Sequence, residues 1–149
     1  MVDDLNISSS FNLSFAQRVE SNLENKDSLI AIVADSFYDT YVFLTQNQRD
    51  DLSLLVMAGS WIEGVYLTSQ IAVSAEESEE FIRIIAEQKK PLHKMIELME
   101  PFKDSQKMAD LYEDFLELQE IYAGVDKEIA TEKFEEISKK IESIRNKLV

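Results

Sequence analysis

The chain has 149 residues, of which 45% are hydrophobic and 30% are charged, a composition typical of one folded domain and unlike that of a disordered segment or a membrane bundle. Three glycines and two prolines are too few for the many turns of a β-sandwich or barrel, so an all-α fold is predicted. A formal charge of −14, no cysteine and one histidine argue against nucleic-acid binding, disulfides and most metal or nucleophile sites. We therefore expect a protein that is not an enzyme and has no metal, cofactor or catalytic residue.

The N-terminal part of the chain predicts two helices. Residues 1–9 are polar and are expected to fray, and Ser10 can cap a first helix that runs to about Leu23. Asn25 or Asp27 can cap a second helix. The residues of this second helix that are expected to face inward are Leu29, Ile30, Ile32, Val33, Phe37, Tyr41 and Leu44.

Residues 52–67 predict a third helix of a different kind, because they are apolar on nearly every face and Glu63 is their only charge. Asn47 is the expected N-cap of this helix. A helix that is hydrophobic all round is expected to be buried all round, with the other helices around it. A transmembrane span is the alternative, but it needs about 20 apolar residues and this run is shorter and interrupted. We therefore expect no transmembrane segment.

A fourth helix is predicted from Ser74 or Ser78 to Met99. Pro91 lies inside its apolar pattern and should kink the helix or split it near Lys89, because proline removes a backbone donor.

A fifth helix is expected to open at Ser105 and to end at Gly124 as a C′ glycine. A last helix is predicted from Lys127 or Thr131, with one buried stripe made of Phe134, Ile137, Ile141, Ile144 and Leu148. Because the connections are short, neighbouring helices should run antiparallel. The sequence therefore predicts one domain over residues 1–149, an antiparallel up-and-down bundle of five or six helices with a buried central third helix.

The candidate ligand-binding residues lie on the third helix. They are Ser60, Trp61, Glu63, Gly64 and Tyr66. A buried carboxylate is costly unless it is paired, so Glu63 is a structural contact, part of an exposed helix face, or a polar anchor in an apolar pocket with Trp61 and Tyr66. The cations expected to reach it lie on the next helix: Arg83, Lys89 and Lys90. The small residues Ser60 and Gly64 leave two explanations open, close packing of another helix or room for a ligand.

His93 is the one histidine, and Lys90 stands three residues before it, so the Glu-x-x-His pattern of a di-iron bundle is missing. We expect His93 to face solvent or to pack.

Two stretches carry a resemblance: NKDSLIAIVADSFYDTYVFL at 25–44 and LVMAGSWIEGVYLTSQ at 55–70. They resemble a family of helical proteins from Bacteroidota of no known activity, whose members have an NKDS…DxFxxT helix followed by an AGxWxEx(L/V)Y helix. The resemblance implies a helical bundle, often in a cell-envelope lipoprotein, and any pocket shared with the family would include Trp61 and Glu63. Relatives usually have an additional helical half and a lipidation signal before the matched part, so we expect this chain to be the second half of a longer protein or a shorter relative.

The leading functional expectation is a non-catalytic structural or protein-interaction module, with a protein partner or self-association. The alternative is a binding module for a small apolar or amphipathic molecule near Trp61, Glu63 and Tyr66. The residues themselves do not indicate a compartment; the resemblance alone suggests the cell envelope or periplasm.

Overall fold

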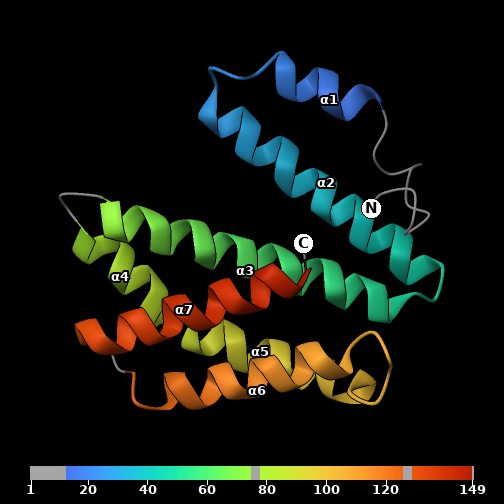
Figure 1. Cartoon of the computed structure of the whole chain (residues 1–149). Coiled ribbons are helices and arrows are strands. Elements are labelled where there is room, and N and C mark those ends of the chain that lie inside the picture. Colours follow the sequence, from blue (N-terminus) through green and yellow to red (C-terminus); the bar gives the residue numbers. More distant parts are fainter. Residues whose placement is uncertain (1–12, 75–77, 126–128, 149) are drawn as a thin grey trace. The chain divides into compact units, whose positions relative to one another are not determined.

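The computed structural model describes residues 13–74, 78–125 and 129–148 (Figure 1). Within these ranges the chain forms α-helices and one 3-10 helix, with no strand, so the predicted all-α bundle is confirmed. Ser10 and Lys127, proposed above as helix starts, lie outside the described residues. The elements are α1 (Leu13–Glu20), α2 (Lys26–Gln46), α3 (Asp50–Ser74), α4 (Ser78–Glu87), α5 (Lys89–Met99), η1 (Glu100–Phe102), α6 (Ala109–Ala123) and α7 (Thr131–Leu148).

The chain divides into two compact units, Met1–Ser53 and Leu54–Val149, which we call the N-terminal and C-terminal units. The single domain expected from the length of the chain stays a prediction.

In the N-terminal unit α1 packs against α2, and Arg18 Nη2 lies 3.2 Å from Asp35 Oδ2. Asn25 is the N-cap of α2, since its side chain accepts a hydrogen bond from the backbone N–H of Ser28 at 3.0 Å. Of the two caps considered for this helix, Asn25 is therefore the one used.

The inward face expected for α2 is only partly buried. Ile32 and Leu44 are buried, whereas Val33, Phe37 and Tyr41 are 42%, 45% and 47% exposed. The expectation that these three side chains face inward is therefore wrong.

The turn between α2 and α3 is built differently from the prediction. Asn47 is the C-cap of α2, and its backbone N–H and its side-chain amide both donate to the Phe43 carbonyl. Gln48 follows with a positive φ of 56°, and α3 begins at Asp50. Asp50 and Asp51 lie in the first turn of α3, where the helix dipole favours negative charge. Asn47 thus ends one helix and does not begin the next.

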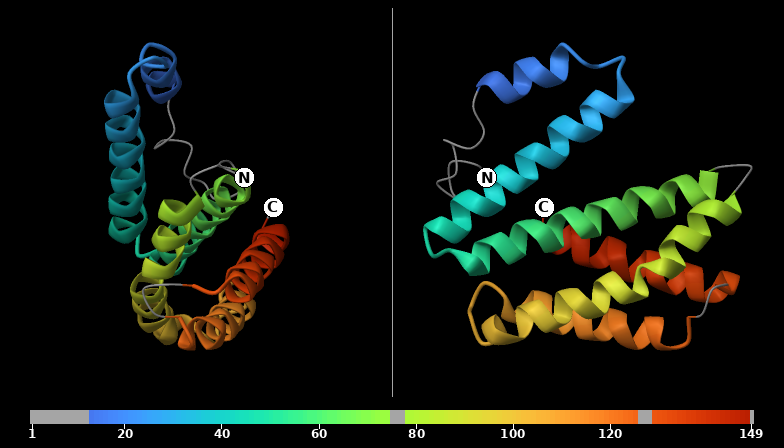
Figure 2. Two further views of the ribbon diagram at one scale, coloured as in Figure 1. Left: turned by 90° about the vertical axis from the view of Figure 1, so that its left-hand side faces the viewer. Right: turned by 180° about the vertical axis from the view of Figure 1, so that it is seen from behind.

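The C-terminal unit is an up-and-down bundle of four columns, in which a column is a single helix or, for α4 and α5, two successive helices. In both figures α3, the α4–α5 pair, α6 and α7 run in alternating directions (Figures 1 and 2). All four columns contribute to one shared core, which includes Ala58, Ile62 and Val65 from α3, Ile85 from α4, Leu92 and Met99 from α5, Phe115, Leu118 and Tyr122 from α6, and Phe134, Ile137, Ile141 and Ile144 from α7. Each helix needs only one face to reach such a core.

The predicted fourth helix is split, as Pro91 indicated. α4 ends at Glu87 and α5 begins at Lys89, which places Pro91 in the first turn of α5. There the missing N–H of proline costs little, because the first turn of a helix has no intrahelical acceptor for it.

The C-terminal half of the unit departs from the prediction at both ends of α6. α6 begins at Ala109, four residues after Ser105, whose carbonyl accepts from the N–H groups of Met108 and Ala109. Gly124 ends α6 as predicted, but as its C-cap with a φ of −86° and not at the C′ position. α7 begins at Thr131 and buries the predicted stripe, except for Leu148, which is 39% exposed.

Helix α3 is buried along one stripe and not on every face. Ala58, Ile62 and Val65 are at most 5% exposed. The opposite side carries Met57, Gly64, Leu67 and Ile71, which we call the outer face of α3; Leu67 is 51% exposed and Ile71 45%. The third helix is therefore less buried than predicted, because α3 is one of four members around a shared core and is not a central helix surrounded by the others.

Candidate functional site

A hollow of about 210 Å³ lies between α3 and the α4–α5 column. Its lining comes from about two turns of α3, from the end of α4 and from the break before α5: Trp61, Gly64, Val65, Thr68, Ile84, Ile85 and Gln88. Two of the five candidate residues, Trp61 and Gly64, thus lie together in it. No lining side chain is a carboxylate, an imidazole or an amine, so the hollow offers apolar contact and not acid–base chemistry.

The polar side chains in the lining are already bonded within the chain. The Trp61 indole N–H donates to Gln88 Oε1 at 3.0 Å, and Gln88 Nε2 donates to the Ile84 carbonyl at 3.0 Å. The Thr68 hydroxyl donates to the Gly64 carbonyl at 2.8 Å. The break between α4 and α5 therefore positions Gln88 to hold the indole.

The Trp61 ring also reaches the core. Its centroid lies 5.6 Å from that of Phe115 on α6, with the two rings tilted by 49°. Such tilted aromatic pairs are attractive beyond their buried area. Trp61 is thereby fixed from both sides, by Gln88 at the edge of the hollow and by Phe115 beneath.

Gly64 leaves its side of the hollow open. A Cβ added at Gly64 would meet no atom within 4 Å, and the same holds for Gly59. Within the described residues, close helix packing therefore does not explain either glycine, and of the two explanations left open for Gly64 the structure favours free space. The Ser60 hydroxyl donates to the Val56 carbonyl at 2.7 Å, and Ser60 does not line the hollow.

Glu63 and Tyr66 lie on another side of α3, toward α7. Arg145 donates to Glu63 through two nitrogens, with Nε–Oε2 at 2.6 Å and Nη2–Oε1 at 3.2 Å. The Arg145 guanidinium carbon lies 4.5 Å from the centroid of the Tyr66 ring, a cation–π contact. The partner expected for Glu63 on the next helix is therefore wrong, and the cation comes from the last helix instead.

The predicted five residues thus separate into two groups: the structure brings Trp61 and Gly64 together, and Glu63 and Tyr66 together elsewhere. The Glu63 side chain is 41% exposed, so it is not the buried carboxylate considered above. Its two-nitrogen contact with Arg145 joins α3 to α7.

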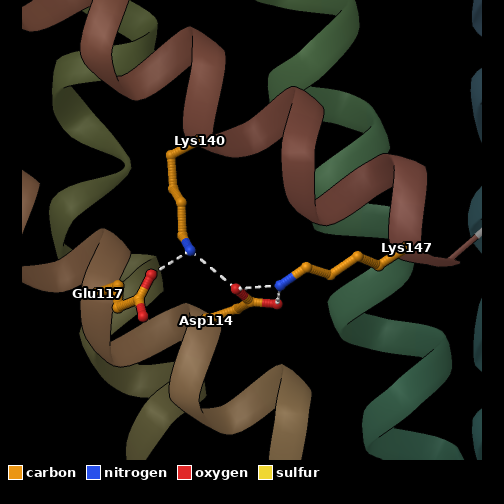
Figure 3. A network of polar contacts seen from close by, with 4 residues as sticks. All are labelled: Asp114, Glu117, Lys140 and Lys147. Atoms are coloured by element: carbon orange, nitrogen blue, oxygen red, sulfur yellow. Dashed lines mark hydrogen bonds and ion pairs between the residues drawn. The ribbon is translucent and has the colours of Figure 1, made fainter.

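The polar cluster that the sequence analysis missed surrounds Asp114 on α6 (Figure 3). Asp114 is 5% exposed and binds two ammonium groups of α7, with Lys140 Nζ at 2.8 Å from Oδ1 and Lys147 Nζ at 2.7 Å from Oδ2. Lys140 also contacts Glu117. A signal was available, since Asp114 stands three residues after Leu111 and four before Leu118, so that it shares a helix face with two leucines.

Burial alone would raise the pKa of the Asp114 carboxyl, because it disfavours the charged form. The hydrogen bonds from Lys140 and Lys147 outweigh burial and hold this pKa below its ordinary value. The carboxylate is therefore charged at neutral pH and ties α6 to two positions of α7, seven residues apart.

Two further groups have structural contacts only. The Tyr122 hydroxyl donates to the Ile85 carbonyl at 3.0 Å beside the break between α4 and α5, and burial raises the pKa of this phenol. His93 is exposed, as expected; its ring bonds to Gln119 and lies 3.4 Å from Glu97. In the ranges that the structure describes, no group of three or more histidine, aspartate or glutamate side chains is placed to hold a metal ion.

No protein-family model, curated protein or solved structure matches this chain. The resemblance to the Bacteroidota family accordingly stays a prediction.

Proposed function

We propose that this chain is a non-catalytic protein-interaction module that offers the outer face of α3 to a protein partner. The observation that carries the proposal is the spacing of Met57, Gly64, Leu67 and Ile71, which are partly or largely exposed and recur every three, four or seven residues along one side of the helix. Single exposed apolar residues are normal on a protein surface, but an aligned group is typical of an interaction site.

The charge distribution supports the same function. The chain carries −14, yet α3 from Leu52 to Ser74 has Glu63 as its only ionisable acidic or basic group, and Arg145 is bonded to it. Such a surface loses little charge hydration when a partner covers it. The strong negative charge elsewhere opposes nucleic acid as the partner.

α2 and α3 each include a segment, Asp27–Gln46 and Asp50–Ser74, long and apolar enough to cross a membrane by length and composition alone. We propose that neither does so. The support for α3 is its stripe in the shared core and its ion pair with α7, a helix rich in charge that could not follow it into lipid. The support for α2 is that Asp27, Asp35 and Asp39 recur along it.

The resemblance of residues 25–70 supports the bacterial cell envelope as the location.

Native mass spectrometry of the chain purified from its own source tests the function. We expect a protein partner at fixed stoichiometry that is lost from the Leu67→Gln/Ile71→Gln variant. The matched control is Leu98→Gln/Leu116→Gln, which changes two other exposed leucines outside α3 and should keep the partner. A chain without a protein partner, or a partner that both variants retain, would contradict the proposal.

A second function, binding of a small apolar or amphipathic molecule, is favoured by the hollow at Trp61 and Gly64. Trp61 is the single tryptophan of the chain, so its fluorescence reports directly on this place. A non-covalent mass adduct in the same spectra, together with a shifted Trp61 emission, would support this function over the first.

A further inference from the structure

We propose that the hollow between α3 and α4 is the anchor pocket of a groove that receives a cationic amphipathic helix of the partner protein. This inference rests on the proposed interaction function and adds the place of docking and the chemistry of the partner. The apolar anchor side chain would occupy the open space at Gly64, between Trp61 and Ile84.

The size of the hollow favours a side chain over a complete ligand. At about 210 Å³ it is smaller than the range of about 300–1,000 Å³ that is usual for small-molecule sites. Because Trp61, Thr68 and Gln88 already have hydrogen-bond partners, the lining does not need a polar ligand to satisfy it. An apolar group projected from a larger partner fits both properties.

The surroundings of the hollow favour a helix as the element that carries this group. Gly64 belongs both to the hollow and to the outer face of α3, so the pocket opens onto a largely apolar stripe from Met57 to Ile71, in which Ser60 is the polar residue. That stripe spans fifteen residues, which separates its ends by about 21 Å at the rise of an α-helix. Partner helices dock in such grooves through apolar residues at i, i+3 or i+4, and i+7.

The charge beside the groove favours a cationic partner. α4 carries Glu79, Glu80 and Glu87 against one Arg83, all exposed. Lys89 lies beyond the break, and its ammonium donates to the Ala123 and Val125 carbonyls at the end of α6. A second copy of the chain would bring another −14, whereas basic residues beside an apolar stripe would meet the acidic side of α4.

The test uses the full chain and two synthetic amphipathic helices of one length, a Leu/Lys peptide and a Leu/Glu peptide. Trp61 fluorescence and titration calorimetry measure the binding. We expect the Leu/Lys peptide to bind, with an affinity that falls as salt is added, and the Leu/Glu peptide not to bind.

Two glycine variants decide whether binding uses the groove. Gly64→Leu fills the hollow, while Gly59→Leu makes the same change at a second open position outside the lining. Thermal unfolding first verifies that both variants fold, and Ile84→Ser, at the rim, replaces Gly64→Leu if that variant does not. We expect Gly64→Leu to weaken binding at least about tenfold and Gly59→Leu to leave it unchanged, because anchor pockets dominate binding energy.

Binding that both glycine variants retain would overturn the proposal, since an unspecific cationic peptide needs only the acidic surface. Equal binding of the Leu/Glu peptide would overturn the assigned charge. A dimer in sedimentation at pH 7 that Leu67→Gln/Ile71→Gln abolishes would show that a second copy of the chain occupies the groove. A small-molecule adduct that is lost in Gly64→Leu would show that a free ligand occupies the hollow. If neither peptide binds but the native partner still depends on Leu67 and Ile71, the groove proposal fails and the interaction function stands.

Discussion

Asp114 is a carboxylate at a core position of α6, and its two ammonium partners both come from α7. A buried carboxylate that is paired with opposite charges adds little to the free energy of unfolding compared with an apolar side chain. Removing one member of the group, however, leaves the other charges buried and unpaired. We therefore expect the arrangement to determine how α6 and α7 are aligned more than to add to the total stability.

We expect Asp114→Asn to lower the free energy of unfolding at neutral pH by about 1.5–3 kcal/mol, the range for hydrogen bonds to charged groups. Because the folded pKa of Asp114 is lowered, its stabilisation is complete above the unfolded value of about 3.9 and is lost as the pH falls through the folded pKa. Urea unfolding of the wild type and of Asp114→Asn, from pH about 7 to about 2, measures the difference in their free energies of unfolding.

The control for this prediction is Glu117→Gln. Glu117 contacts the same Lys140, but its side chain is 67% exposed, so its loss should cost clearly less. A difference between wild type and Asp114→Asn that persists unchanged at the lowest pH would contradict the assigned role of the carboxylate.

At the scale of the element, the apolar composition of α3 does not determine which of its faces are buried. Its near absence of charge led to the expectation of burial on every face, because composition counts apolar residues without stating what covers them. In the C-terminal unit four helices share one core, so only the stripe with Ala58, Ile62 and Val65 reaches it. The two interior glycines lie at positions where a side chain would meet free space.

We expect Gly59→Ala and Gly64→Ala each to raise the free energy of unfolding by about 0.5–1 kcal/mol, because alanine restricts the unfolded chain and favours the helix. Chemical denaturation measures both variants. Gly124→Ala is the comparison outside a helix interior: its site is also open, but it caps α6, so it should change stability less. Destabilisation by either α3 variant would show that a neighbour does pack against that glycine.

The end of α6 depends on a side chain from another helix. Lys89 Nζ donates to the Ala123 and Val125 carbonyls at 3.2 and 2.9 Å, where the helix would otherwise leave acceptors to water. We expect Lys89→Met to cost about 0.5–1.5 kcal/mol in urea unfolding, less than the range of about 1.5–3 kcal/mol for hydrogen bonds to charged groups, because Lys89 is exposed to solvent. Lys90→Met removes the same charge from the adjacent exposed position and should cost less; equal losses would assign the effect to net charge alone.

For the molecule as a whole, local patterns predicted the helices and distant contacts were missed. The spacing of Phe134, Ile137, Ile141 and Ile144 gave the buried stripe of α7, and Pro91 gave the break between α4 and α5. The partner of Glu63 lies 82 residues away, and no local pattern singles out Arg145 for it. Trp61 and Gly64 line one hollow because they share one face of α3, whereas Glu63 and Tyr66 lie apart from them because α7 flanks the other side of the helix.

Net charge governs how whole molecules approach one another. At pH 7 the chain carries −14, which opposes contact between two outer faces of α3; near the sequence pI of about 4.4 this repulsion disappears while the apolar face remains. We expect light scattering to detect concentration-dependent association at pH 4.4 and far less at pH 7. Leu67→Gln/Ile71→Gln leaves the pI unchanged and should reduce the association, whereas Leu98→Gln/Leu116→Gln should not. Association that is equal at both pH values, or unaffected by the α3 substitutions, would mean that charge repulsion does not prevent self-association through the outer face of α3.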